Sequence, residues 1–282
     1  MRLNIDMQTP TFVDQSKIYP FPKVTPIRIP KIINLIKNHY CYKESNPKIL
    51  EESFRKWFNP LIDLNAFPYM YFTNNGITQA LEYIPIHYKR NDIRVLKGDY
   101  FWLKTIGSGI EVDTLEPCDI SYSSSPSSID GSVNDLTWPS KLHILDGAYI
   151  GSSTKKTTVP NNTEIVLLGF GKNLGVPELR LGLIFSKVRL HIIDVFQKTF
   201  SHVGLLGFET ASKVCNEIPI IELAEELKFH QLEFCKKYTD AIFVPSDSAL
   251  LATTEDQNYK FYKRPNGTIR IPLGESISNW IN

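Results

Sequence analysis

Short apolar runs separated by polar turns recur through the middle of the chain. The runs at residues 165–168 and 181–185 are too short for helices and apolar enough for strands buried on both faces. The same pattern predicts seven strands, at residues 69–73, 92–96, 110–112, 119–122, 142–145, 165–168 and 181–185. Together with the helical stretches around them, these strands predict an α/β fold.

Apolar positions at helical spacing flank this central region. They predict helices at residues 31–39, 48–58, 203–214 and 222–238, and one that begins near Ile77. Strands at residues 241–244 and 249–252, and a hairpin that joins 259–262 to 268–273 through a turn at 264–267, predict a smaller α+β unit. Prolines crowd the first 30 residues and predict an extended arm. The expected domains are an arm with helices (1–62), a large domain (63–188) and a small C-terminal domain (189–282).

Composition and charge narrow the class of protein. The chain has 282 residues, 42% of them hydrophobic, and a net charge of +1, so neither nucleic acid nor a membrane is an expected partner. The four cysteines and six histidines show no metal-ligand spacing, so no metal is expected. No signal peptide or apolar run of about 18 residues is present, and we expect a cytoplasmic protein with reduced thiols.

A lysine and an arginine stand between two of the predicted core strands. Lys172 follows the glycine-rich turn at residues 169–171, and Arg180 comes eight positions later, just before the next strand. Charged groups held there are costly unless an anion lies between them, which indicates a ligand site. A dinucleotide-binding turn is disfavoured because Pro177 lies where its helix should run, and a phosphate loop lacks the required residues. A surface turn with two solvated cations stays open on this stretch alone.

Polar residues end other predicted strands. Asp146 follows the strand at 142–145, and Tyr149 comes three residues later. A polar turn at residues 75–78 begins a helix, where unpaired backbone N–H groups can bind an anion. Arg270 lies in the strand near the C-terminus.

In this order, the pairs Asp146 with Tyr149 and Lys172 with Arg180, followed by Arg270, resemble the signature of fold-type I pyridoxal-phosphate (PLP) enzymes, the aminotransferase superfamily. The resemblance implies an α/β large domain with a seven-stranded, mostly parallel sheet that binds PLP, plus the small C-terminal domain. It implies that Lys172 forms a Schiff base with PLP and moves the substrate proton. Asp146 would pair with the ring nitrogen, Tyr149 would bond the phenolic oxygen, and Arg270 would bind the substrate carboxylate.

The resemblance also assigns the remaining cofactor contacts. Phosphate binding falls to Arg180 with the turn formed by Asn75, Gly76, Ile77 and Thr78. Tyr100 would stack on the ring, with Trp102 as the second choice. Two positions depart from the family pattern: Ser128 replaces an asparagine that donates to the phenolic oxygen, and Gly169 replaces a serine or threonine that binds the phosphate. In the homodimer typical of this superfamily, Tyr42 would contact the phosphate of the partner.

The expected activity is a PLP-dependent aminotransferase that acts on an amino acid or a related amine. A PLP-dependent lyase or decarboxylase on the same residues is the first alternative, and a degenerate, non-catalytic homologue is the second. A nicotinamide-dependent oxidoreductase is a distant third. The sequence points to no second carboxylate-binding arginine, so it neither supports nor excludes a dicarboxylic substrate.

Overall fold

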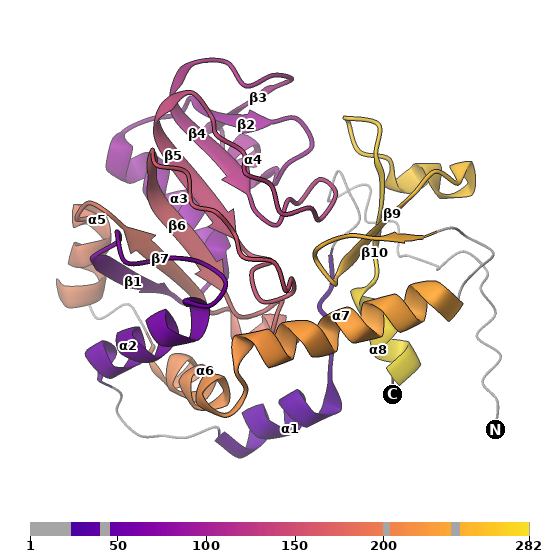
Figure 1. The fold of residues 1–282 in the computed structure, drawn as a ribbon. Coiled ribbons are helices and arrows are strands. Elements are labelled where there is room, and N and C mark those ends of the chain that lie inside the picture. The colour runs from indigo at the N-terminus through magenta and orange to yellow at the C-terminus, as the bar shows by residue number, and fades with distance from the viewer. Residues whose placement is uncertain (1–23, 40–45, 200–203, 238–242, 282) are drawn as a thin grey trace.

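The computed structural model describes residues 24–39, 46–199, 204–237 and 243–281. Its centre is a seven-stranded sheet in the order β1-β7-β6-β5-β4-β2-β3 (Figure 1). The strands are β1 (Tyr69–Thr73), β2 (Ile93–Leu96), β3 (Gly109–Val112), β4 (Cys118–Ser124), β5 (Ser140–Gly147), β6 (Thr163–Gly169) and β7 (Gly182–Ser186). All seven lie where the apolar runs predict them. Within this sheet β7 pairs antiparallel with both neighbours, whereas the ladders from β6 to β3 are parallel.

Both faces of the sheet are covered by helices, which explains the continuous apolar runs in β6 and β7. Along β6, Val166 and Leu168 join one hydrophobic core and Ile165 and Leu167 join another. Successive side chains of a strand point to opposite faces, so each face of β6 contributes to its own core.

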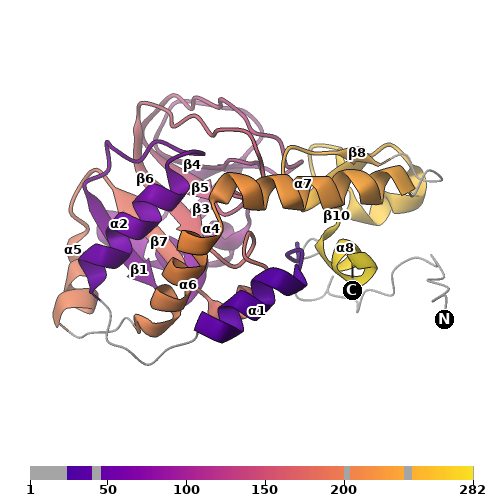
Figure 2. The same ribbon diagram turned by 60° about the horizontal axis from the view of Figure 1, so that its bottom comes forward.

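Three helices cover the face seen at the front of Figure 2: α1 (Pro30–His39), α2 (Pro47–Phe58) and α6 (Leu206–Glu217). Helix α2 begins as its sequence predicts, because Asn46 accepts a hydrogen bond from Lys48 N at 3.0 Å and Pro47 occupies the first turn. Aromatic side chains fill this core, with the rings of Phe54 and Phe170 4.8 Å apart. On the other face lie α3 (Gly76–Tyr88), α4 (Trp102–Thr105) and α5 (His191–Asp194).

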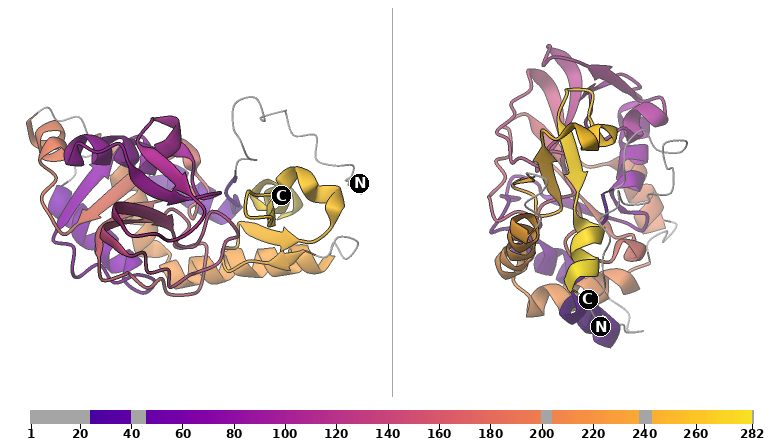
Figure 3. Two further views of the ribbon diagram at one scale, coloured as in Figure 1. Left: turned by 90° about the horizontal axis from the view of Figure 1, so that it is seen from above. Right: turned by 90° about the vertical axis from the view of Figure 1, so that its right-hand side faces the viewer.

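A second sheet lies beside the first, in the order β10-β9-β8 (Figure 3). It comprises β8 (Val244–Pro245), β9 (Leu251–Thr254) and β10 (Ile269–Pro272), followed by α8 (Gly274–Ile281). Helix α7 (Ile220–Lys237) runs from the large sheet to the small one (Figure 2).

The predicted C-terminal hairpin is wrong in one arm. Residues 257–262 (Gln257–Tyr262) form two short 3₁₀ turns that meet at a kink at Tyr259, and β10 pairs with β9 instead. Tyr259 and Tyr262 both pack against the main core.

No helix in the described ranges has the length and apolar character to cross a membrane. Nor do those ranges hold a group of three or more histidine, cysteine or acidic side chains that could bind a metal ion.

Candidate functional site

The carboxyl end of β5 carries a buried carboxylate. Asp146 is 3% exposed and accepts hydrogen bonds from Tyr122 Oη at 2.7 Å and from Ala148 N at 2.8 Å. Burial raises the pKa of Asp146 to about 6, although the hydrogen bonds from Tyr122 and Ala148 and the charge of Lys172 act to lower it. Tyr122 reaches Asp146 because β4 and β5 are adjacent parallel strands.

Lys172 lies in the turn after β6, close to Asp146 and Tyr149. Its Nζ is 5.8 Å from the centre of the Tyr149 ring and donates to the backbone oxygen of Val24. Tyr149 is buried, and burial raises its pKa to about 12. The amine, the carboxylate and the phenol that the sequence predicts for one site are therefore brought together.

Arg180 packs on the turn that begins α3. Its backbone is left-handed (φ 51°), and its side chain donates to Asn75 through Nε to Oδ1 and through Nη2 to the backbone oxygen, each at 3.0 Å. Gly76 N donates in return to Arg180 O at 2.7 Å. A Cβ on Gly182 would lie 2.6 Å from the carbonyl carbon of Gly76, so this close approach requires glycine two residues after Arg180.

The other predicted phosphate contacts lie around the same turn. A Cβ on Gly169 would come 3.4 Å from Ile77 Cδ1, so Gly169 adjoins the first turn of α3. The hydroxyl groups of Thr78 and Tyr100 are 3.5 Å apart. Tyr100, which follows β2, therefore lies next to the helix N-terminus that the sequence assigns to the phosphate.

Ser128 is engaged by a carboxylate that the sequence analysis missed. Its hydroxyl donates to Asp99 Oδ1 at 2.6 Å, and Asp99 also accepts from Ser124 Oγ at 2.6 Å and from Tyr100 N at 2.7 Å. Asp99 is 3% exposed. The signal that could have found it is its position immediately after Gly98, at the end of a predicted strand.

Two buried arginines of the C-terminal segment complete the cluster. Arg270 donates through Nη1 to Ser128 O, and Arg264 donates through Nη2 to Gly98 O. Burial lowers the pKa of Arg270, and burial together with the charge of Arg270 lowers that of Arg264 to about 9. Both positive charges act on Tyr149. The sequence analysis placed Arg264 in an ordinary hairpin turn and gave it no role.

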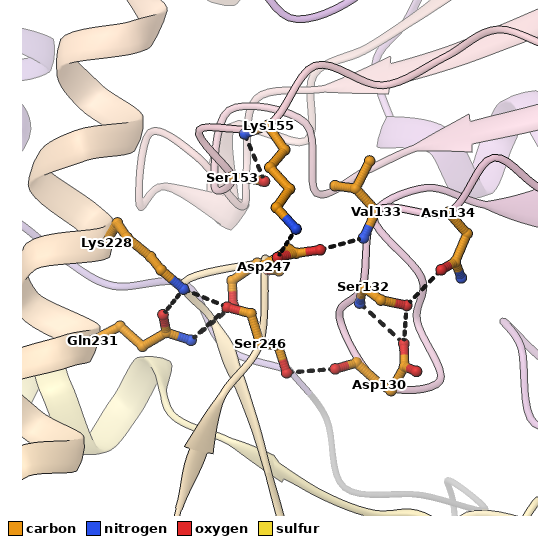
Figure 4. A network of polar contacts seen from close by, with 11 residues as sticks. Asp130, Ser132, Val133, Asn134, Ser153, Lys155, Lys228, Gln231, Ser246 and Asp247 are labelled. Carbon is orange, nitrogen blue, oxygen red and sulfur yellow. Dashed lines mark hydrogen bonds and ion pairs between the residues drawn. The ribbon is translucent and has the colours of Figure 1, made fainter.

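A polar network ties the small sheet to the loop that carries Ser128 (Figure 4). Asp247 accepts from Val133 N at 2.9 Å and pairs with Lys155 at 2.8 Å. Ser246 Oγ donates to Asp130 O. These contacts hold β8 and β9 against residues 130–133, and so fix the strand that bears Arg270 relative to the large sheet.

One predicted residue, Tyr42, lies outside the described residues.

Known proteins resemble this chain in structure alone. No protein-family model matches it, and no curated protein matches it in sequence. Among solved structures, histidinol-phosphate aminotransferase from Sinorhizobium meliloti, in complex with PLP, matches with a TM-score of 0.64 and 15% identity over 92% of this chain and 89% of that one. The PLP-bound C–S lyase from Staphylococcus hominis matches with a TM-score of 0.61 and 12% identity over 96% and 94%.

A third match has a different reaction in its name. L-threonine-O-3-phosphate decarboxylase from Porphyromonas gingivalis gives a TM-score of 0.59 and 14% identity over 93% of this chain and 98% of that one. Structural matches at such low sequence identity establish the architecture and leave the reaction open. The chain therefore has the fold of the fold-type I PLP-dependent enzymes, the aminotransferase-like superfamily.

Proposed function

We propose that the protein is a PLP-dependent aminotransferase that acts on an amino acid or a related amine. The observation that carries the proposal is that Lys172, Asp146 and Tyr149 share one cluster at the carboxyl ends of the strands. This is where open α/β sheets bind their ligands.

The described side chains fit the groups of PLP one by one. Lys172 supplies an amine for the aldehyde, Asp146 a buried carboxylate for the ring nitrogen, and Tyr149 a phenol for the phenolic oxygen. Arg180 adds a cation to the N-terminus of α3 for the phosphate. A Cβ on Gly182 would collide with that turn, so glycine allows β7 to approach the start of α3 closely at the proposed phosphate site.

When bound, PLP supplies an electron sink for the bond broken at the substrate Cα. The residues of this chain would bind the cofactor and the substrate and would move the proton. Asp146, as a carboxylate, would keep the ring nitrogen protonated, and Tyr149 would donate a hydrogen bond to the phenolic oxygen. The amine of Lys172 would hold PLP and, once the substrate amine had replaced it there, would take the proton from the substrate Cα. Arg270 binds the substrate carboxylate.

Among the solved structures that share this fold, aminotransferases are joined by a decarboxylase and a C–S lyase. Those two reactions are the alternative on the same residues. The assembly is proposed as a homodimer, on the resemblance alone.

The first test is whether PLP attaches to Lys172. The purified protein should show the absorbance band of PLP bound to a lysine. After borohydride reduction, peptide mapping should find the cofactor attached to Lys172. Lys172→Ala should abolish the adduct. Lys187→Ala, which removes a lysine that bonds Asn161 O away from the site, should not. A protein that takes up no PLP overturns the proposal.

The second test separates the reactions. Incubation with an amino acid should convert the cofactor to pyridoxamine phosphate with release of one equivalent of 2-oxo acid. Release of ammonia together with the oxo acid would indicate elimination, and release of carbon dioxide would indicate decarboxylation.

A further inference from the structure

A groove lies at the opposite end of the large sheet from Lys172. It is lined by the segment before β1 (residues 63–67), by the loop before β6 (residues 156–161) and by Lys187, which follows β7. Strand β6, seven residues long, begins just after this loop and ends just before the turn that carries Lys172. At about 3.3 Å per residue, the strand places about 20 Å between the groove and the amine. The groove is therefore distinct from the cofactor site proposed above.

Hydrogen bonds to other parts of the fold hold both walls of the groove. Arg55 of α2 donates to Leu64 O at 3.2 Å and to Phe67 O at 2.7 Å, which fixes the segment before β1. Thr157 N donates to Leu61 O at 2.8 Å, which ties the loop before β6 to the chain that follows α2. The space between the walls has a volume of about 440 Å³. Sites for small molecules are commonly preformed and enclose about 300–1,000 Å³, so the groove has the size and the fixed walls of a small one.

The lining combines apolar surface with an ammonium group that is held in place. The apolar part comes from Phe67, Val159 and Pro160. Lys187 is half-buried, its Nζ lies 5.4 Å from the centre of the Phe67 ring, and it donates to Asn161 O at 3.0 Å. An ammonium group carries three N–H donors, so this bond fixes the position of Lys187 and still allows it to pair with an anion.

The groove also has an excess of positive charge. Lys156 is exposed, and its side chain forms no hydrogen bond or ion pair within the part of the chain that the structure describes. Among the described lining residues, the one negative charge is that of Asp63, against those of Lys156 and Lys187. Thr157 is 2% exposed, and its hydroxyl has no hydrogen-bond partner among the described residues. An unpaired buried hydroxyl costs free energy, which a polar group of a bound molecule would offset.

We propose that this groove binds a small monocarboxylate with an apolar body. The carboxylate pairs with Lys187 and Lys156, and the apolar body lies against the Phe67 ring and its apolar neighbours. The two lysines disfavour a cation, and Asp63 disfavours a second negative charge on the ligand. The inference does not depend on the proposed function, because no residue of the groove takes part in it.

The test compares three molecules of one shape on the full-length protein as purified: 3-phenylpropanoate, 3-phenylpropanamide and 3-phenylpropan-1-amine. Isothermal titration calorimetry at low ionic strength measures the affinity of each. We expect the carboxylate to bind about 5- to 10-fold more tightly than the neutral amide, and the amine to bind more weakly than either. Added salt should reduce the preference for the carboxylate, because both lysines are at least partly exposed and their charges are screened.

Acetylation of lysine side chains locates the bound carboxylate. Peptide mapping after brief treatment with an acetylating reagent should show that 3-phenylpropanoate slows the reaction of Lys156 and Lys187. Lys260, an exposed lysine of the small domain, should react at the same rate with and without it. Lys156→Gln and Lys187→Gln should each weaken binding of the carboxylate and leave the affinity for the amide within about twofold, since only the charged pair is lost. Lys260→Gln should leave all three affinities unchanged.

No detectable binding of the carboxylate, or equal affinity for the carboxylate and the amide, overturns the inference. So does a preference for the carboxylate that survives both lysine substitutions, or binding that protects neither lysine, since the molecule would then lie elsewhere. Attachment of PLP to Lys172 is measured separately, from the absorbance of the cofactor, so this inference and the proposed function can each fail without the other.

Discussion

Replacing Asp146 with asparagine should make the PLP-free protein more stable while weakening its hold on PLP. The two side chains have the same shape. Asparagine can accept the bond from Ala148 N through its oxygen and donate its amide to Tyr122 Oη, so both present contacts have a counterpart. The difference is that the folded variant does not have to bury the negative charge of the Asp146 carboxylate.

The size of the effect follows from the pKa. Burial raises the pKa of Asp146 from 3.8 to about 6. At about 1.4 kcal/mol for each pH unit, keeping this carboxylate ionised at pH 8 costs the folded state about 3 kcal/mol. A raised pKa means that the folded state binds more protons than the unfolded state between pH 3.8 and 6, so wild-type stability falls as the pH rises through this window.

We therefore expect Asp146→Asn to be more stable than the wild type by about 3 kcal/mol at pH 8, and by under about 1 kcal/mol near pH 4. Urea unfolding of both PLP-free proteins across this pH range measures the difference. PLP at about 1,000 times its Kd should reverse the order at pH 8. It adds about 4.1 kcal/mol to the protein that binds it, which exceeds the advantage of the variant, and the amide cannot pair with a protonated ring nitrogen.

Asp119→Asn is the opposite control. Asp119 is half-buried, and the hydrogen bonds that it accepts from Lys141 and Arg90 lower its pKa, so losing this charge should not stabilise the protein at pH 8. A stability gain for Asp146→Asn that did not change with pH, or no gain at pH 8, would refute the reasoning.

Three further substitutions test the cofactor contacts. Tyr122→Phe removes a hydrogen bond that lowers the pKa of Asp146. The midpoint of the fall in PLP affinity at acidic pH, measured by fluorescence titration, should therefore move up by about one to two pH units. An unchanged midpoint would contradict this. Gly169→Ser should tighten PLP binding, because the nearest atom to a new Cβ is Ile77 Cδ1 at 3.4 Å and the hydroxyl would adjoin the first turn of α3; weaker binding in equilibrium dialysis would argue against the phosphate assignment. Arg180→Gln should weaken PLP about 10-fold or more and leave the affinity for pyridoxal, which lacks the phosphate, nearly unchanged; an equal loss for both ligands would exclude a phosphate contact.

The large sheet could be predicted from the sequence because burial on both faces leaves a strong local signal. Four consecutive apolar residues, as at residues 165–168, predict a strand whatever residues flank them. The small sheet carries less signal, since its strands are short and its aromatic residues suit either a strand or a turn. Tyr259 and Tyr262 have high strand propensity, but their contacts with the main core favour a 3₁₀-helix, so tertiary packing overrode propensity.

The contrast between local sequence signals and tertiary contacts also explains which residues of the site could be predicted. Lys172, Asp146 and Tyr149 each end a strand or follow one closely, so sequence order already predicts that they meet at one edge of the sheet. Arg264 has no such position. Its burial depends on the turn at residues 264–268 reaching Gly98, which lies 166 residues earlier in the chain, and no local pattern encodes that contact.

One carboxylate links the loops after β2 and β4 to the two buried arginines. Asp99 bonds Ser128, and so joins the loop after β2 to the loop after β4. Each loop offers one carbonyl to the small domain: Gly98 O accepts from Arg264 and Ser128 O accepts from Arg270. The Asp99–Ser128 bond therefore connects the two loops whose carbonyl groups accept from the two arginines. This gives a reason for serine at position 128, because its short side chain joins the two loops. Under the proposed function, donation to the phenolic oxygen would fall to Tyr149, whose raised pKa keeps its proton in place.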